Sequence, residues 1–335
     1  METPFSAGEK IIAVRGRRFL LKVETSSESA DYRKYDDLRE AVWGFPEDHL
    51  AGTRNLMCEN YLHEGGSLFL AAYVEDAGGG FVEDAGHLVG FAYGFIGVKD
   101  KSVAFKSADN LRFYSQYTGV LPAWRGFDLG GALKELQAEV LSGDWGVFEV
   151  VCTFDPLTGV NARRNIHRFG MRVLEYRAAT YGEYGGRLNR KDIPSDRLFM
   201  SWDLRPPAPR PALDLEAVRG GGRETVKVEV LSAATRSGRV DLEVVREVDL
   251  SGRPPFRIVR VPADFYRLLR ETDVDDPAIR RIPLEWRMAV RRVFQDSLAE
   301  GYEAVDFVDL PGVSPARWAY ILGGIEVGPK PQGGS

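Results

Sequence analysis

The stretch from Arg112 to Gly170 contains four regular elements and one glycine-rich turn in a defined order. The strand-like run RFYSQYTGV comes first, and LPAWRGFDLGGALKELQAEVL then forms a turn that leads into a helix. VFEVVCTFDP follows as a second, buried strand, and NARRNIHRFG follows as a second helix that ends at Gly170. A glycine-rich turn before a helix is a ready anion site, because the first backbone N–H groups of a helix have no internal partner and the helix dipole favours negative charge. We therefore predict an anionic ligand at this turn.

The turn begins at Arg125 and contains Gly126, Asp128, Gly130 and Gly131. In order and in residues the stretch resembles the GNAT superfamily of acyl-coenzyme A dependent N-acyltransferases. Members of that family carry Arg/Gln-x-x-Gly-x-Gly/Ala between the fourth strand and the third helix. Arg125 fills the first position of this motif and Gly130 the last, whereas Asp128 stands where the family usually has glycine. The motif is short, and its place after a strand and before a helix is what makes it informative.

The composition is that of a globular chain with a sizeable core. Of its 335 residues 44% are apolar and 28% are charged, which allows one large domain or two. The formal net charge is −5, from 44 basic and 49 acidic residues, and it argues against broad binding of nucleic acid. The two cysteines, Cys58 and Cys152, fit neither a disulfide framework nor a metal site, so we expect no metal. No apolar run is long enough to span a bilayer and METPFSAGEK lacks a signal core, so we expect a cytoplasmic protein without membrane contact.

Hydrophobic periodicity predicts the other elements of the first half. IIAVRGRRFLLKVE alternates and predicts a hairpin that turns at Arg15–Gly16. Helices are expected over residues 31–43 and 50–63, and strands in SLFLAAYVE, HLVGFAYGFIGV, MRVLEYRAATYG and RLFMSWDL. Over the first ~200 residues this succession is the order of GNAT proteins. We therefore expect the α/β class, with a mixed sheet whose centre splays open.

A change in composition after this half predicts a second domain. Residues 205–223 are rich in Pro, Arg and Gly and have little periodicity, so we expect a linker between a GNAT domain over 1–204 and a smaller GNAT-like α/β domain over 224–327. The strong helix LEWRMAVRRVFQDSLAEG lies in the second domain, and its Arg287, Arg291 and Arg292 are expected on a solvated outer face. Residues 328–335 are expected to be a disordered tail. No second Arg-x-x-Gly-x-Gly precedes this helix, so one acyl-CoA site is expected.

The resemblance implies that the turn holds the pyrophosphate of acetyl-CoA or another acyl-CoA as co-substrate. Glycines let the backbone come close to the phosphates, and an arginine adds a charged partner. The end of the preceding strand is where the family's fourth strand bulges and parts from the fifth to admit the pantetheine arm, although an ordinary strand end is the alternative. Asparagines on the second helix could hydrogen-bond that arm. The candidate cofactor residues are Gly119, Val120, Arg125, Gly126, Gly130, Gly131, Asn161 and Asn165.

Asp128 leaves two interpretations open. Its carboxylate could cap the helix, using the N–H groups that the pyrophosphate needs, and would then weaken cofactor binding. Alternatively the carboxylate points to solvent. A turn that caps the helix without any ligand is the wider alternative to the cofactor site.

The usual catalytic groups of the family are missing from their places. The predicted fourth strand contains Gln116 instead of a glutamate. Ile166 occupies the position where many members have a tyrosine that acts as a general acid. Gln116 could orient a water or bind substrate, Asp155 could be a base or bind the substrate ammonium, and Tyr181 could protonate the leaving thiolate. For Asp155 a turn residue before Pro156 is an equal alternative, and for Tyr181 an exposed loop position.

Other polar residues carry weaker hypotheses. Arg197 beside Asp196 could bind an acceptor carboxylate, but a surface ion pair is the favoured interpretation. His167 is expected at the surface, and Tyr184 is a second loop tyrosine.

The resemblance as a whole implies an N-acyltransferase. The acyl group is acetyl by default and succinyl as an option, and the acceptor is the amine of a small molecule or amino acid. The alternative is a GNAT-fold module that binds CoA or another ligand without turnover, which the residues at positions 128 and 166 motivate. A purely structural oligomer is a third possibility. A homodimer is among the expected assemblies.

Overall fold

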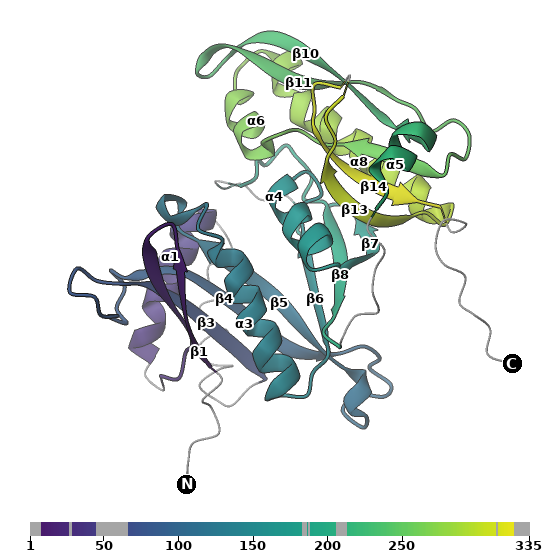
Figure 1. The fold of residues 1–335 in the computed structure, drawn as a ribbon. Coiled ribbons are helices and arrows are strands. Elements are labelled where there is room, and N and C mark those ends of the chain that lie inside the picture. Colours follow the sequence, from purple (N-terminus) through teal and green to yellow (C-terminus); the bar gives the residue numbers. More distant parts are fainter. Residues whose placement is uncertain are drawn as a thin grey trace, which may run out of the picture. The chain divides into compact units, whose positions relative to one another are not determined.

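The computed structural model describes residues 8–26, 29–44, 66–182, 186, 188–205, 213–312 and 314–324. The chain divides into two compact units (Figure 1). Unit 1 comprises Met1–Cys152, Gly185–Leu188 and Asp203–Pro207, and unit 2 comprises Thr153–Tyr184, Asn189–Trp202 and Ala208–Ser335. The helix expected over 50–63, Cys58, Tyr184 and the expected tail lie outside the described residues. The domain limits expected from the sequence stay a prediction.

Unit 1 is built on an antiparallel meander that ends in a parallel strand. Its hairpin turns at Arg15 and Gly16, whose φ angles of 51° and 73° are those of a tight two-residue hairpin turn, as predicted. Five consecutive strands pair with their neighbours in sequence, and the next strand then pairs in parallel with the fifth, which makes the sheet mixed. The strands are β1 (Glu9–Val14), β2 (Arg17–Val23), β3 (Ser67–Val74), β4 (Leu88–Val98), β5 (Leu111–Val120) and β6 (Glu149–Phe154), the last of which runs on into unit 2.

Helices cover both faces of this sheet (Figure 1). On one face, α1 (Arg33–Trp43) packs its Tyr35 ring against Phe91, with centroids 5.8 Å apart, and Gly44 ends the helix at φ 58°. On the other face lies α3 (Leu129–Gly143), whose Leu133 approaches Gly90, the residue beside Phe91. Alternate residues of a strand point to opposite faces, so the two helices enclose the sheet between them. The short helical turns of unit 1 are η1 (Ser29–Tyr32), η3 (Ala108–Asn110) and η4 (Pro122–Trp124).

β5 contains a bulge, although not at the glycine where it was expected. Tyr93 of β4 pairs with Tyr117 and the next residue, Gly94, pairs with Ser115, so Gln116 is the extra residue. The bulge resets the alternation of the strand, which places Tyr114 and Tyr117 on the same face although they are three residues apart. Gly119 serves a close approach instead, because a Cβ atom there would lie 2.7 Å from the Trp43 ring.

β5 and β6 pair only at their beginnings. Their parallel ladder joins Phe113 to Val150 and Tyr114 to Val151, and the described residues give no further pair between the two strands. β5 continues from Ser115 to Val120 with its ladder to β4 alone. A short ladder of this kind is what the splayed centre of the sheet requires.

Unit 2 combines segments from the middle and the end of the chain. A helical segment with a wide π-helical second half follows β6, and an antiparallel strand pair follows it. A long two-stranded hairpin and a four-stranded mixed sheet, of order β13-β14-β12-β9, make up the remainder. The elements are α4 (Gly159–Ala162), η5 (Arg163–Arg168), β7 (Arg172–Arg177), β8 (Arg197–Asp203, whose last residue belongs to unit 1), α5 (Leu215–Gly221), β9 (Gly222–Glu224), β10 (Val226–Thr235), β11 (Gly238–Val248), β12 (Phe256–Arg260), α6 (Phe265–Glu271), α7 (Pro277–Arg280), α8 (Ile282–Ala299), β13 (Glu303–Asp309) and β14 (Trp318–Gly323).

Part of the expected linker is regular structure. Asp214 accepts hydrogen bonds from the N–H groups of Glu216 and Ala217 at 2.9 and 3.2 Å and so begins α5 within residues 205–223. Val218 of this helix is fully buried, and Leu213 and Leu215 pack against the same core cluster. The segment contains few apolar residues, so its sequence alone shows no helical periodicity.

The close approach at Gly119 leads to a stability prediction. We expect Gly119→Ala to lower the free energy of unfolding by about 1–3 kcal/mol, because the added methyl group would overlap a ring wedged against the strand. Chemical denaturation followed by circular dichroism measures the change. Gly143→Ala is the matched control: its Cβ would meet nothing within 4 Å, so this change at the end of α3 should be neutral or stabilising. Equal effects of the two substitutions would contradict the packing shown at Trp43.

Candidate functional site

The turn before α3 presents unused backbone donors. The N–H groups of Gly131 and Ala132 both donate to the Asp128 carbonyl, at 3.0 and 3.1 Å. Those of Gly126, Phe127, Leu129 and Gly130 donate to no residue within the described part of the chain. Leu129 and Gly130 are free donors of the kind that the first turn of a helix offers to an anion, and Gly126 and Phe127 lie just before that turn.

Asp128 does not cap the helix. It stands at the N-cap position with φ 57° and ψ 21°, and its side chain accepts no capping hydrogen bond. A capping side chain normally needs an extended backbone at this position, so the left-handed conformation keeps the carboxylate from the helix end. Glycine adopts such a positive φ without strain, and aspartate tolerates it. Of the two interpretations left open by the sequence, the structure agrees with an exposed carboxylate.

Aromatic contacts hold the turn before α3 against β2. The Phe127 ring lies edge-on to Phe19 of β2 at 5.5 Å and tilted to Trp124 at 5.8 Å. Arg15 from the first hairpin lies beside the turn: its guanidinium carbon is 5.9 Å from the Phe127 ring, and its Nη1 lies 3.4 Å from where a Cβ of Gly126 would be. Arg125 is exposed at the turn itself. Two arginines therefore add positive charge where the free N–H groups gather.

The candidate residues of β5 lead toward this turn. Gln116 is half-buried at the bulge, and Gly119 and Val120 end the strand. On the α3 side of β5, the buried Lys134 donates to the Ser115 hydroxyl at 3.2 Å, a contact that the sequence did not suggest. Unit 1 thus brings together six of the predicted cofactor residues, Gly119, Val120, Arg125, Gly126, Gly130 and Gly131.

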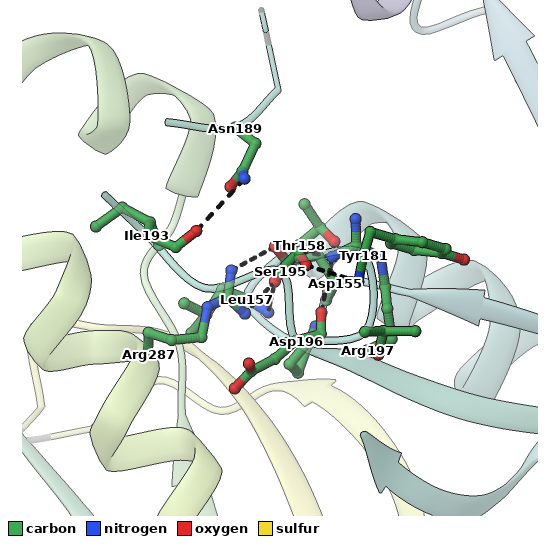
Figure 2. Close-up of polar contacts among 12 residues, drawn as sticks. Asp155, Leu157, Thr158, Tyr181, Asn189, Ile193, Ser195, Asp196, Arg197 and Arg287 are labelled. Carbon is green, nitrogen blue, oxygen red and sulfur yellow. Dashed lines mark hydrogen bonds and ion pairs between the residues drawn. The ribbon is translucent and has the colours of Figure 1, made fainter. Parts of the chain in front are cut away.

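Asp155, in unit 2, is held by arginine (Figure 2). Arg287 of α8 donates to both of its carboxylate oxygens, at 2.7 and 2.5 Å, and Arg197 lies 3.8 Å away. The Leu157 N–H donates to the same carboxylate at 2.9 Å, which makes the turn before Pro156 that was the alternative interpretation. Burial alone raises the pKa of the Asp155 carboxyl, but the charge and hydrogen bonds of Arg287 outweigh it, so the pKa lies below its ordinary value. Such a carboxylate is a weak base.

A second buried carboxylate, that of Asp196 just before β8, is bound by an arginine of the same helix, α8. Asp196 is fully buried and accepts two hydrogen bonds from Arg291, at 2.8 and 2.7 Å, and one from the Tyr176 hydroxyl at 2.7 Å. Burial, and next the charge of Asp196, raise the pKa of Tyr176. The surface pair expected between Asp196 and Arg197 is therefore wrong. Asp196 pairs with Arg291 instead, and Arg197 donates to the Asp196 backbone carbonyl.

The solvated arginine face expected on α8 is correct only for Arg292. The side chain of Arg292 is 65% exposed, whereas Arg287 is fully buried. Residues 287 and 291 are four apart and flank the apolar stripe of Trp286 and Val290, so their positions along the helix pointed inward. The spacing along the helix indicates burial, whereas the charge of arginine favours a surface position, and in this helix the carboxylate partners decide.

The remaining candidates of unit 2 differ in their contacts. The Tyr181 ring is 44% exposed, its hydroxyl lies 3.0 Å from that of Thr153, and Arg197 lies over the ring at 5.0 Å. Asn161 accepts a hydrogen bond from Arg164 at 2.8 Å. Asn165 is buried in the π-helical segment, and its side-chain oxygen has no partner in the described part of the chain. His167 pairs with Asp306 at 2.9 Å.

Metal and membrane features are absent from what the structure describes. Its described residues contain no group of three or more His, Cys, Asp or Glu side chains that could hold a metal ion. None of the described helices is long and apolar enough to cross a membrane.

Comparisons with known proteins find similarity at the level of structure only. No family model and no curated protein matches the chain. Similar solved structures include Arabidopsis thaliana NAA60 in complex with acetyl-CoA, at 12% identity and a TM-score of 0.40, covering 55% of this chain and 98% of that one. A protein of the GNAT family from Desulfovibrio desulfuricans has 17% identity and a TM-score of 0.38, covering 55% of this chain and 99% of that one. Ribosomal-protein-S5-alanine acetyltransferase from Vibrio fischeri has 10% identity and a TM-score of 0.39, covering 60% and 100%. These activities belong to the neighbours, so the proposal below depends on the chain's own geometry.

The pair of Asp155 and Arg287 predicts a loss of stability when either partner is removed. We expect Arg287→Met to lower the free energy of unfolding by about 3–5 kcal/mol, because it leaves a buried carboxylate uncompensated. Arg292→Met is the matched control on the same helix and should stay within about 0.5 kcal/mol of wild type. Urea denaturation of both variants measures the difference.

The same pair predicts the direction of a pH effect. The folded pKa of Asp155 is lowered, so its contribution to stability is complete above the unfolded value of about 3.9 and is lost as pH falls toward the folded value. Asp155→Asn should therefore flatten the pH dependence of stability below about pH 4. An unchanged slope in that range would contradict the ionised pair.

Proposed function

We propose that the chain is an acyl-CoA dependent N-acyltransferase whose co-substrate binds at the N-terminus of α3. The observation that carries the proposal is the open end of this helix: four backbone N–H groups at the turn have no partner in the described residues, and Asp128 leaves them uncapped. A diphosphate is the ligand that best fits several unpartnered N–H groups in one short segment and two nearby arginines.

The order of elements supports the same proposal. The turn follows β5 and opens α3, which is the position of the motif in GNAT proteins, and the ladder between β5 and β6 is two residue pairs long. In the family's arrangement the pantetheine arm enters where these strands part. The free edge of β5 up to Val120 is where that arm would pair with the backbone.

The reaction proposed is the transfer of an acyl group to an amine. The amine nitrogen attacks the thioester carbonyl, the carbon–sulfur bond breaks, the CoA thiolate leaves and takes up a proton, and the amine loses one. Acetyl is the default acyl group and succinyl the option, with a small-molecule amine or an amino acid as acceptor. Tyr181 is the candidate acid, because its ring is exposed and Arg197 lies near it. Gln116 is the candidate for orienting water or substrate.

A second candidate function is binding of CoA without turnover. Two observations favour it: Asp155 is tied to Arg287 and is a weak base, and the family's usual tyrosine position holds the buried Ile166. Binding without product distinguishes this function from the first.

Binding is tested by titration calorimetry with CoA and acetyl-CoA. Gly130→Glu should abolish binding, because its side chain fills the space of the diphosphate and adds negative charge. Asp128→Gly should strengthen binding about fivefold to tenfold by removing a nearby carboxylate. Asp128→Asn is the matched control, since it removes the charge without adding glycine's flexibility. Unchanged affinity in the Gly130 variant, or no binding by wild type at millimolar CoA, would show that the turn is not the site.

Turnover is tested by release of the free thiol with a panel of amines and amino acids. Tyr181→Phe should lower kcat by about tenfold or more and leave CoA affinity unchanged, as expected for loss of a general acid. Thiol release by wild type excludes the binding-only function. Tight CoA binding with no release for any amine of the panel would favour it.

A further inference from the structure

The β10–β11 hairpin of unit 2 has one covered edge and one open edge. On β11, the Glu243 carbonyl accepts a hydrogen bond from the Trp286 indole of α8 at 2.8 Å, so the outer edge of β11 is met by this helix. β10 pairs with β11 over its whole length, and in the described residues no other strand pairs with it. The middle of this edge, residues 229–232, is exposed and offers backbone donors and acceptors to another strand.

The side chains along this edge are unusually exposed. Residues 229–232 are all exposed, and they include Val230 at 53% and Leu231 at 43%. Leu231 pairs with the buried Leu242, so it lies on the face of the hairpin that is packed against the protein. Ala233 on the same face is buried, so the exposure of Leu231 shows that the cover is incomplete along the middle of β10. A two-stranded hairpin is only marginally stable in water by itself, so one with exposed aliphatic side chains gains stability when a further strand pairs with it.

We propose that β10 is a dimerisation edge, on which a second copy of this chain pairs antiparallel through its own β10. The two hairpins then form one four-stranded sheet with Leu231 at the two-fold axis. This inference is independent of the proposed acyl transfer, because it uses only the hairpin.

The register follows from side-chain chemistry. When a two-fold axis perpendicular to the sheet relates the two strands, paired residues lie on the same face of the sheet. The axis then passes midway between the two copies of one residue, which pairs with itself. An axis at Val230 sets Leu231 against the Glu229 carboxylate of the second copy, and an axis at Glu229 sets the two glutamates against each other. An axis at Leu231 avoids both, because the two leucines meet and Glu229 faces Ala233.

Charge complementarity supports the register at Leu231. Here Lys227 stands opposite Thr235 of the second copy. The Thr235 hydroxyl donates to the Glu271 carboxylate at 2.8 Å, so an ammonium group faces a carboxylate. Symmetry forms this contact twice. Within its own chain, the Lys227 ammonium group lies 3.0 Å from the Glu247 carboxylate of β11.

The test measures molar mass in solution by light scattering after gel filtration. Wild type should be a dimer, and Leu231→Asp should be a monomer with an unchanged circular dichroism spectrum, because the residue is exposed within one copy. Leu231→Cys, when oxidised, should give a covalent dimer under non-reducing conditions. Val305→Cys is the matched control, since this residue on β13 is 40% exposed and should give none.

Charge reversal tests the register separately from the edge. Lys227→Glu should weaken the dimer by about tenfold. Adding Glu271→Lys to that variant should restore the dimer, which a merely local role for Lys227 would not produce. Monomeric wild type at about 100 µM would overturn the proposal. So would a wild-type dimer that persists in Leu231→Asp, because its interface would then lie elsewhere.

Discussion

The buried pair of Asp155 and Arg287 is the contact on which unit 2 depends. It joins the turn after β6 to the long helix α8, across 132 residues of sequence, with two hydrogen bonds to one carboxylate. Asp196 and Arg291 repeat the arrangement one helical turn further along α8. The Tyr320 hydroxyl adds a bond to the Pro156 carbonyl at 2.7 Å. α8 and β14 are therefore part of the same unit as the end of β6.

These ion pairs also bear on the chemistry. Removing a charge from water costs several kcal/mol, which a bidentate arginine in a buried setting can offset. A carboxylate stabilised in this way keeps its negative charge and has little tendency to take a proton. Asp155 therefore fits an anchor better than a base, and the proton transfers of an acyltransferase would fall to exposed groups such as Tyr181 or to water. Unit 1 depends on a different constraint, the left-handed backbone of Asp128, which leaves the donors of α3 open to a ligand.

Local sequence predicted much of the fold. Alternation and turn residues located the hairpin at Arg15–Gly16, apolar periodicity located α1 and α3, and the turn at Arg125–Gly131 was expected to open a helix. Hydrophobic periodicity was less informative where a helix has few apolar residues or where a charged side chain is buried. α5 has few apolar residues and begins because Asp214 caps it, and Arg287 was assigned to the surface because of its charge. The bulge of β5 was expected at a glycine, although backbone pairing with β4 places it at Gln116.

The sequence by itself determined most of the elements and the place of the glycine-rich turn before α3, because periodicity, glycine and helix termini act within a few residues of the chain. Only the tertiary structure decided the role of the charged residues. Whether Asp155 is a base or an anchor, and whether Arg287 and Arg291 face water or a carboxylate, depends on partners more than 90 residues away. The free energy of a charged group depends on its burial and on the charges around it, and neither is a property of the neighbouring sequence.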